Sequence, residues 1–116
     1  PARTIIGVRS VGQAELFRQL LPEARQLGLI AEPDDIEAYV EAGVETIRLW
    51  PRWLTDDQLG GRVKKAGALL HLNGTTGNVE EVSGLLKYHP DSLSSDDPGR
   101  LVRTLAGFSK RTTSEP

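Results

Sequence analysis

The sequence predicts an α/β fold built on a parallel sheet, and two observations carry that prediction. First, five short apolar runs alternate with helix-like stretches, and strands that alternate with helices are typical of a parallel sheet. Second, residues 41–47 and 65–70 both lead from a helix end through a glycine into an apolar strand, which is the usual joint in such a sheet. The five runs are Ile5–Val8, Leu27–Ile30, Thr46–Trp50, Leu69–Leu72 and the weaker Asp91–Ser94.

The number of these βα units sets the expected architecture. A complete barrel of eight units typically needs about 250 residues, whereas this chain has 116. We therefore expect a partial TIM-type barrel of five βα units, with a small open flavodoxin-like sheet as the alternative. A partial barrel leaves its edge strands unpaired and its inner face uncovered. We therefore expect the chain to form a homo-oligomer or to associate with a complementary N-terminal half.

The composition is that of one globular domain and excludes several classes of function. Apolar residues make up 38% of the chain and charged residues 26%, and the formal net charge is −2. The sequence has no basic stripe, so nucleic acid is not an expected partner. No run approaches the roughly 20 apolar residues of a membrane span. The chain has no cysteine, so disulfides and thiol nucleophiles are excluded and the cellular compartment is not indicated.

Helix boundaries are marked by residues that typically cap the first turn of a helix and by glycines that typically end one. Thr55 and Gln58 have the capping-box spacing, Asn78 offers a similar start, and Asp97 precedes a proline. Further helices are expected over residues 13–21 and from residue 33 or 34 to 42. The first of them carries Leu16, Leu20 and Leu21 on one face. Three glycines are expected to end helices: Gly43, Gly67 and Gly107. We assign one domain to residues 1–108 and a disordered polar tail to residues 109–116.

A cluster of aromatic and basic residues follows the third apolar run. Trp50, Arg52 and Trp53 place two indoles and a guanidinium where a strand ends. One interpretation is a wall beside a substrate, with Arg48 or Arg52 on its phosphate. The other is that a tryptophan packs over the rim of the sheet while Arg52 is solvated.

The fourth run is followed by a small, polar, glycine-rich turn over residues 73–78. Such a turn exposes backbone N–H groups, so Gly74, Thr75 and Thr76 are candidate phosphate contacts. The turn contains neither lysine nor arginine, and it matches no dinucleotide or Walker pattern. A plain connecting loop is therefore the competing interpretation.

Three Asp-Asp pairs and one histidine complete the candidates. The pairs Asp34–Asp35, Asp56–Asp57 and Asp96–Asp97 all follow expected strands. Carboxylates that converge at one edge of a sheet could bind Mg²⁺ or Ca²⁺, but each pair also falls where a helix should start, so capping is the simpler interpretation. His71 lies inside an apolar run without an acidic neighbour, which favours a buried or inward-facing ring over a catalytic base.

Several segments, taken in order, resemble the C-terminal part of the glycerophosphodiester phosphodiesterase family. They are Ser10, Leu16, Leu21-Pro22, Gly28-Leu29, Ala42-Gly43-Val44, Leu49-Trp50-Pro51, Leu54-Thr55, Ala66-Gly67, Asn73, Asn78 and Asp91–Pro98. The last of these is similar to the family's Asp-Gly-Ile-Ile-Thr-Asp-Arg-Pro stretch. Where the family usually has Trp-Thr-Val-Asn, this chain has His71–Gly74 and no tryptophan. The resemblance covers about residues 4–105 and implies a TIM-type barrel.

The resemblance also implies which parts of the site this chain lacks. In the family a divalent cation (Mg²⁺ or Ca²⁺) and two histidines act on the phosphodiester, and their ligands and motifs lie on the first three strands. The chain resembles the family only from the fourth strand onward. The resemblance therefore implies no catalytic and no metal-binding residue here, and it implies no cofactor for this chain alone. It adds Asn73 to Trp50, Arg52 and Trp53 as the substrate-side wall.

We therefore expect the C-terminal piece of a glycerophosphodiester phosphodiesterase-like protein, inactive by itself. The parent reaction would be metal-assisted hydrolysis of glycerophosphodiesters, so whether this chain counts as an enzyme stays open. The alternative is a non-catalytic assembly or binding module on a degenerate half-barrel, which the departure from Trp-Thr-Val-Asn favours. A weaker alternative is an unrelated flavodoxin-like domain with generic βα periodicity.

Overall fold

The computed structural model describes residues 5–54 and 58–114, with side chains described as far as residue 108. Its sheet has five strands, and every neighbouring pair is parallel. The strands are β1 (Ile5–Val8), β2 (Arg25–Gly28), β3 (Thr46–Leu49), β4 (Leu69–Asn73) and β5 (Ser92–Ser94). The α-helices are α1 (Val11–Leu20), α2 (Ile36–Glu41), α3 (Gln58–Lys65), α4 (Val79–Leu86) and α5 (Pro98–Ser114), and short 3₁₀ turns η1 (Pro33–Asp35) and η2 (Pro51–Trp53) follow β2 and β3.

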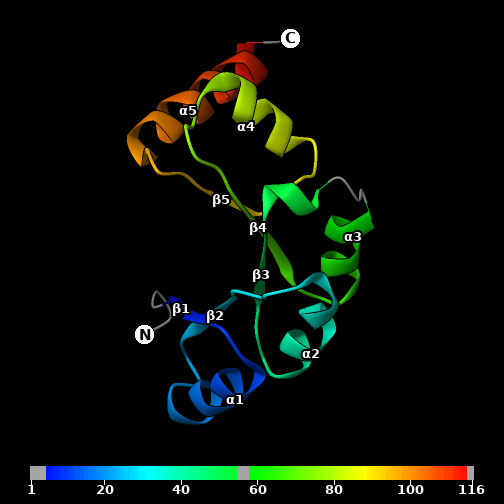
Figure 1. The fold of residues 1–116 in the computed structure, drawn as a ribbon. Helices are drawn as coiled ribbons and strands as arrows, with labels where there is room; N and C mark the ends of the chain where they lie inside the picture. The colour runs from blue at the N-terminus through cyan, green and yellow to red at the C-terminus, as the bar shows by residue number, and fades with distance from the viewer. Residues whose placement is uncertain (1–4, 55–57, 115–116) are drawn as a thin grey trace.

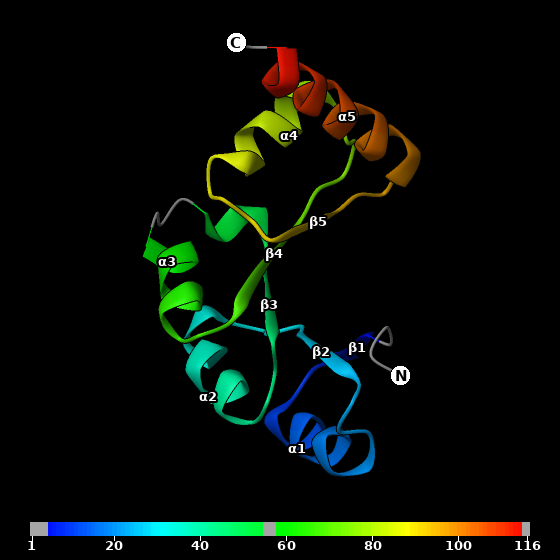
Figure 2. The same cartoon turned by 180° about the vertical axis from the view of Figure 1, so that it is seen from behind.

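The strands lie side by side in chain order, β1-β2-β3-β4-β5. Each is followed by a helix, and the helices form an arc along the outside of the curved sheet (Figures 1 and 2). This is a half-barrel, which confirms the predicted partial TIM-type barrel. The flavodoxin-like alternative is wrong, because a doubly wound sheet would reverse its strand order at a switch point.

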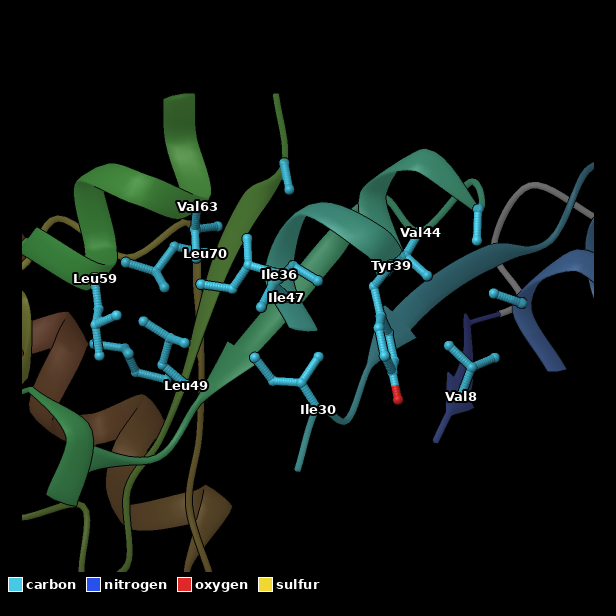
Figure 3. Close-up of a cluster of buried hydrophobic side chains, with 14 of the residues drawn as sticks. Val8, Ile30, Ile36, Tyr39, Val44, Ile47, Leu49, Leu59, Val63 and Leu70 are labelled. Carbon is cyan, nitrogen blue, oxygen red and sulfur yellow. The ribbon is translucent and has the colours of Figure 1, made fainter. Parts of the chain in front are cut away.

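The hydrophobic core lies between the sheet and its helices. Ile47 and Leu49 of β3 and Leu70 and Leu72 of β4 are fully buried and alternate with partly exposed or exposed neighbours. Because successive strand side chains point to opposite faces, these residues define the outer, helix-covered face of the sheet. Figure 3 shows several of them packed with residues of α2 and α3, and the labelled set comprises Val8, Ile30, Ile36, Tyr39, Val44, Ile47, Leu49, Leu59, Val63 and Leu70.

The predicted boundaries at α4 and α5 are confirmed. The Asn78 side chain accepts a hydrogen bond from the backbone N–H of Glu81 at 2.8 Å, and α5 begins at Pro98 with the Asp97 carboxylate accepting from the N–H of Arg100 at 3.1 Å. Gly43 and Gly67 follow helices at positive φ, at 110° and 93°, as C-terminal caps do. The capping box predicted at residues 55–58 falls largely outside the described residues.

Other expectations need correction. Strand β2 occupies Arg25–Gly28 and so begins two residues before the predicted run. Gly107 does not end a helix, because it lies inside α5, which continues to Ser114. On α1, Ala14 is the buried residue, whereas the expected apolar face stays exposed at Leu16 (51%), Leu20 (65%) and Leu21 (49%).

Candidate functional site

The inner face of the sheet is uncovered and changes character along the strands. Ile5 of β1 and Leu69 of β4 remain 64% and 46% exposed. Toward the carboxyl ends the side chains become polar: Arg48, His71 and Ser92 are neighbours in register on β3, β4 and β5. In parallel α/β sheets ligands bind at the carboxyl ends of the strands, so this polar end of the inner face is the candidate site.

His71 is held in a hydrogen-bond network on this face. Its Nδ1 lies 2.6 Å from Ser92 Oγ and its Nε2 lies 3.1 Å from Ser94 Oγ, while Ser94 Oγ donates to Asn73 Oδ1 at 2.7 Å. Because the Ser94 proton is used on Asn73, the Nε2–H of His71 donates to Ser94. In the neutral ring Nδ1 then accepts from Ser92, so both nitrogens are occupied.

The electrostatic surroundings favour the same neutral form of His71. Burial of the ring lowers its pKa, the Asn73 side chain opposes this by hydrogen bonding, and the positive charge of Arg48 lowers it further. The net shift is downward from 6.5, which favours the neutral ring at pH 7. The prediction of a partly buried, inward-facing histidine agrees with this geometry, and the orienting partners are serines.

A cavity of about 310 Å³ opens beside this network. It brings together Trp50, Asn73, Gly74 and Thr75, which the sequence analysis drew from two separate segments. Its lining residues are Trp50, Pro51, Asn73, Gly74, Thr75, Ser94, Ser95 and Asp96. Sequence reasoning missed Ser94 of β5 and Ser95, which follows that strand. The alternation in Ser92-Leu93-Ser94 was the available signal, because it places Ser92 and Ser94 on the same face of the sheet.

The other candidate wall residues lie at the edge of this cavity. Arg52 is exposed, with its Cζ 5.2 Å from the ring centroid of Trp50 and 5.9 Å from that of Trp53. Trp53 is partly buried and packs against the hydrophobic core. The competing interpretation, a tryptophan packed over the sheet rim, therefore describes Trp53, whereas Trp50 lines the cavity.

The glycine-rich turn after β4 is already filled by an anion from its own chain. The Glu81 carboxylate accepts hydrogen bonds from the backbone N–H groups of Thr75 (2.9 Å), Thr76 (3.4 Å) and Gly77 (3.0 Å), and from the Thr75 hydroxyl (2.7 Å). The N–H of Gly74 donates to the Ser94 carbonyl at 2.6 Å. The backbone donors expected to contact phosphate are therefore engaged, and in this structure the turn is a closed connecting loop.

Glu81 itself was not singled out as a functional residue, and its pKa reflects the loop it occupies. Burial raises the pKa of this carboxyl, but hydrogen bonds from the Thr75 side chain and from the backbone of Gly77, Thr75 and Thr76 lower it more strongly. The sequence signal was the spacing from Asn78 to Glu81 at the helix start. A capping box would direct Glu81 to the Asn78 N–H, whereas here that group donates to Thr76 Oγ1 at 3.2 Å.

The Asp-Asp pairs serve several purposes. Asp97 caps α5, as the simpler interpretation predicts. Asp34 instead pairs with Arg62 at 3.3 Å, beside the pair between Arg62 and Glu37 at 2.6 Å, and Asp35 precedes α2 without a side-chain cap hydrogen bond. The pair Asp34–Asp35 therefore lies at a helix start as predicted, in the first turn of η1, but Asp35 makes no cap hydrogen bond. The pair Asp56–Asp57 lies outside the described residues.

The donor groups for a divalent cation do not converge within residues 5–54 and 58–108. No group of three or more histidine, aspartate or glutamate side chains in that part is arranged to hold a metal ion. The residues present therefore do not fit the cation of the resembled family, and we derive no step through it. Among the helices of the described part, none combines the length and the apolar character needed to cross a bilayer.

Fold and site together define the class: an open, all-parallel α/β half-barrel with a polar cavity at the carboxyl ends of its strands. Comparison with protein-family models and with curated proteins finds no match. The assignment of a function therefore rests on the site itself.

Arg48 is the least satisfied side chain of the site. Its Nε is buried without a hydrogen-bond partner among the described residues, and its Cζ stacks 4.0 Å from the ring centroid of Trp50. Burial lowers the pKa of Arg48, and the positive charges of Arg9 and Arg52 lower it further. The chain thus retains a cation that is partly desolvated and repelled by like charges.

We therefore expect Arg48→Met to raise the free energy of unfolding by about 1 kcal/mol. An orphaned buried donor costs about 1–3 kcal/mol, whereas the lost cation–π contact is worth about 0.5–1 kcal/mol, and methionine retains the apolar stem. Urea denaturation followed by circular dichroism measures the difference. The control is Arg25→Met, which removes an exposed arginine paired with Glu45 at 3.5 Å and should change stability by less than about 0.5 kcal/mol. A clear loss of stability in Arg48→Met would contradict this account.

Proposed function

We propose that this chain is the C-terminal part of a glycerophosphodiester phosphodiesterase-like barrel and supplies one wall of its substrate site. The observation that carries the proposal is the half-barrel itself: five parallel strands in sequential order, with an uncovered inner face whose polar end opens into a cavity. A barrel completed by further strands would cover Ile5 and Leu69, which are exposed on this face. The same strands would pair with the free edges of β1 and β5.

The lining of the cavity supports a role in binding a polyol. The indole of Trp50 offers an apolar wall, and Asn73, Ser94 and Ser95 offer amide and hydroxyl groups around it. Small-molecule sites combine such a wall with a few polar groups that fix orientation. In this proposal the chain binds and orients the glycerol side of the substrate, and the groups that move protons belong to strands outside this chain.

The neutral state of His71 fits a binding role. Its two nitrogens are engaged by Ser92 and Ser94, and its pKa is lowered by burial. A general base must reach the proton that it removes, and here the ring would first have to break a hydrogen bond to a serine. His71 therefore acts in this proposal as a support that positions Ser94 and, through it, Asn73.

We expect the purified chain to release no choline from glycerophosphocholine, with or without Mg²⁺ or Ca²⁺. Addition of a polypeptide carrying the first three strands of such a barrel should restore turnover once the two pieces co-elute. Trp50→Ala should then raise KM more than it lowers kcat, because it removes part of the wall and no reacting group. Hydrolysis by the chain alone would refute the proposal that this chain binds the substrate while the first three strands carry the catalytic groups.

A second candidate function is a non-catalytic assembly module built on the same scaffold. The exposed leucines of α1 and of the residue after it (Leu16, Leu20 and Leu21) favour it, because they add an apolar patch outside the cavity. Light scattering after size exclusion, across a tenfold concentration range, measures the mass of the chain in solution. A stable dimer, together with a co-eluting but inactive mixture of the two barrel parts, would favour the assembly module over the phosphodiesterase part.

A further inference from the structure

The carboxyl ends of β1 and β3 gather three arginines. Arg9 directly follows β1, Arg48 lies in β3 and Arg52 in the 3₁₀ turn η2. Two of their guanidinium groups lie beside one indole, because the Cζ atoms of Arg48 and Arg52 are 4.0 Å and 5.2 Å from the ring centroid of Trp50. Burial lowers the pKa of Arg48, and the positive charges of Arg9 and Arg52 lower it further.

This positive cluster has no counter-charge among the ion pairs of the described residues. Those pairs use Arg25, with Glu45, and Arg62, with Asp34 and Glu37. Asp96 lines the cavity beside Trp50, but no ion pair joins it to an arginine in the described part of the chain. Arg48 in addition buries an Nε–H without an acceptor. Like charges held together in this way are what a bound anion would stabilise.

We propose that Arg48 and Arg52, held by Trp50, bind a phosphate-type oxyanion of a small molecule. A guanidinium presents N–H groups in a fixed fork that matches the oxygens of phosphate, and stacking on an indole fixes the plane of that fork. The adjoining cavity of about 310 Å³ accommodates the rest of the molecule, with Ser94 and Asn73 available on its wall. The donors of the glycine-rich turn take no part, since Glu81 occupies them.

This site goes beyond the proposed function, because it requires only this chain and no completed barrel. It also differs from the backbone cradle that the sequence predicted after β4, since its donors are side chains of β3 and η2. Desolvation of Arg48 costs free energy in the unbound chain. In this proposal that cost is offset on binding, because the guanidinium is already oriented before the anion arrives.

The test is a titration of the purified chain with sodium phosphate at pH 7.5, with ionic strength held constant by sodium chloride. Intrinsic tryptophan fluorescence reports on the site, because the chain contains only Trp50 and Trp53, and calorimetry gives an independent dissociation constant. We expect saturable binding that Arg48→Met weakens about tenfold or more and Arg52→Gln several-fold. Since Arg48→Met is expected to fold at least as stably as the parent chain, lost binding would not reflect unfolding.

The matched control is Arg25→Met, which removes one positive charge from the same inner face but from a residue already paired with Glu45. Its phosphate affinity should stay within about twofold of the parent value. An equal loss in both variants, a response no different from that to chloride, or tighter binding of acetate than of phosphate would overturn the proposal. None of these readouts depends on turnover, so this site and the proposed phosphodiesterase role can fail separately.

Discussion

Replacement of Glu81 by alanine is expected to lower the free energy of unfolding by about 2–4 kcal/mol. The carboxylate accepts from three backbone N–H groups and the Thr75 hydroxyl, and hydrogen bonds to a charged group contribute about 1.5–3 kcal/mol each, less where water can replace them. Its removal leaves the turn between β4 and α4 without its central acceptor. Urea denaturation of the variant measures the loss.

Two variants separate this effect from simple loss of charge. Glu80→Ala removes the same charge from the same first turn of α4, at an exposed position, and should change stability by no more than about 0.5 kcal/mol. Glu81→Gln retains an acceptor oxygen but not the charge, so we expect an intermediate loss. If Glu80→Ala were as destabilising as Glu81→Ala, the stabilisation would belong to the helix dipole and not to the loop.

The same carboxyl makes stability depend on pH. The pKa of Glu81 is lowered below its ordinary value of 4.5, because the hydrogen bonds outweigh burial. Its contribution is therefore fully present above about pH 4.5 and is lost as the pH falls through the lower pKa of the folded chain. In Glu81→Gln this part of the acid sensitivity should disappear, so the stability difference between parent and variant should shrink toward pH 3. A difference that stays constant from pH 7 to pH 3 would contradict the assignment.

Gly77→Ala is expected to destabilise the chain by a similar amount, about 2–4 kcal/mol. Gly77 has φ of +70°, a conformation that costs an L residue about 1 kcal/mol, and a Cβ there would lie 2.9 Å from the backbone nitrogen of Leu101. Because the obstruction is backbone, α5 must shift away from the turn, which adds about 1–3 kcal/mol. Thermal unfolding and urea titration both report the change.

Substitutions at two other glycines separate the conformational cost of Gly77→Ala from its steric cost. Gly67 has positive φ, but a Cβ at this position would meet no atom within 4 Å, so Gly67→Ala should cost only the conformational part. Gly84 lies within α4 and also has open space around it, so Gly84→Ala should stabilise the chain by up to about 1 kcal/mol. Equal losses at Gly67 and Gly77 would mean that the contact with Leu101 contributes nothing.

Local sequence patterns predicted most of the elements correctly for identifiable reasons. The β3 and β4 runs are apolar enough to be read directly, and Asn78 and Asp97 supply acceptors where first turns need them. The wrong predictions concern sequence patterns that are compatible with more than one structure. Leu16 and Leu20 of α1 have the spacing of a buried face, yet both are exposed in the folded chain.

Part of the candidate site could likewise be predicted from the sequence, and part could not. Trp50 could be proposed from its position after a strand, because the carboxyl ends of parallel strands meet at one edge of the sheet. Asn73 came from the family resemblance, and it lines the same cavity. The role of Glu81 could not be predicted, since its carboxylate reaches back four to six residues to accept hydrogen bonds from the turn. The lack of an ion pair at Arg48 and Arg52 within the described residues could not be predicted either. It depends on which carboxylates pair with Arg25 and Arg62 in the folded chain.

Apolar periodicity and caps within a few residues were enough to predict the class of fold, the number of βα units and most helix starts, because these features depend on short stretches of chain. The folded chain was needed to show that the strands run in sequential order around half a barrel, and that Glu81 closes the loop that had seemed fit for phosphate. It was also needed to show that Arg48 and Arg52 share one indole and that the ion pairs within residues 5–54 and 58–108 leave both arginines out. These features depend on how side chains and strands meet in three dimensions, and no local pattern of residue types encodes that geometry.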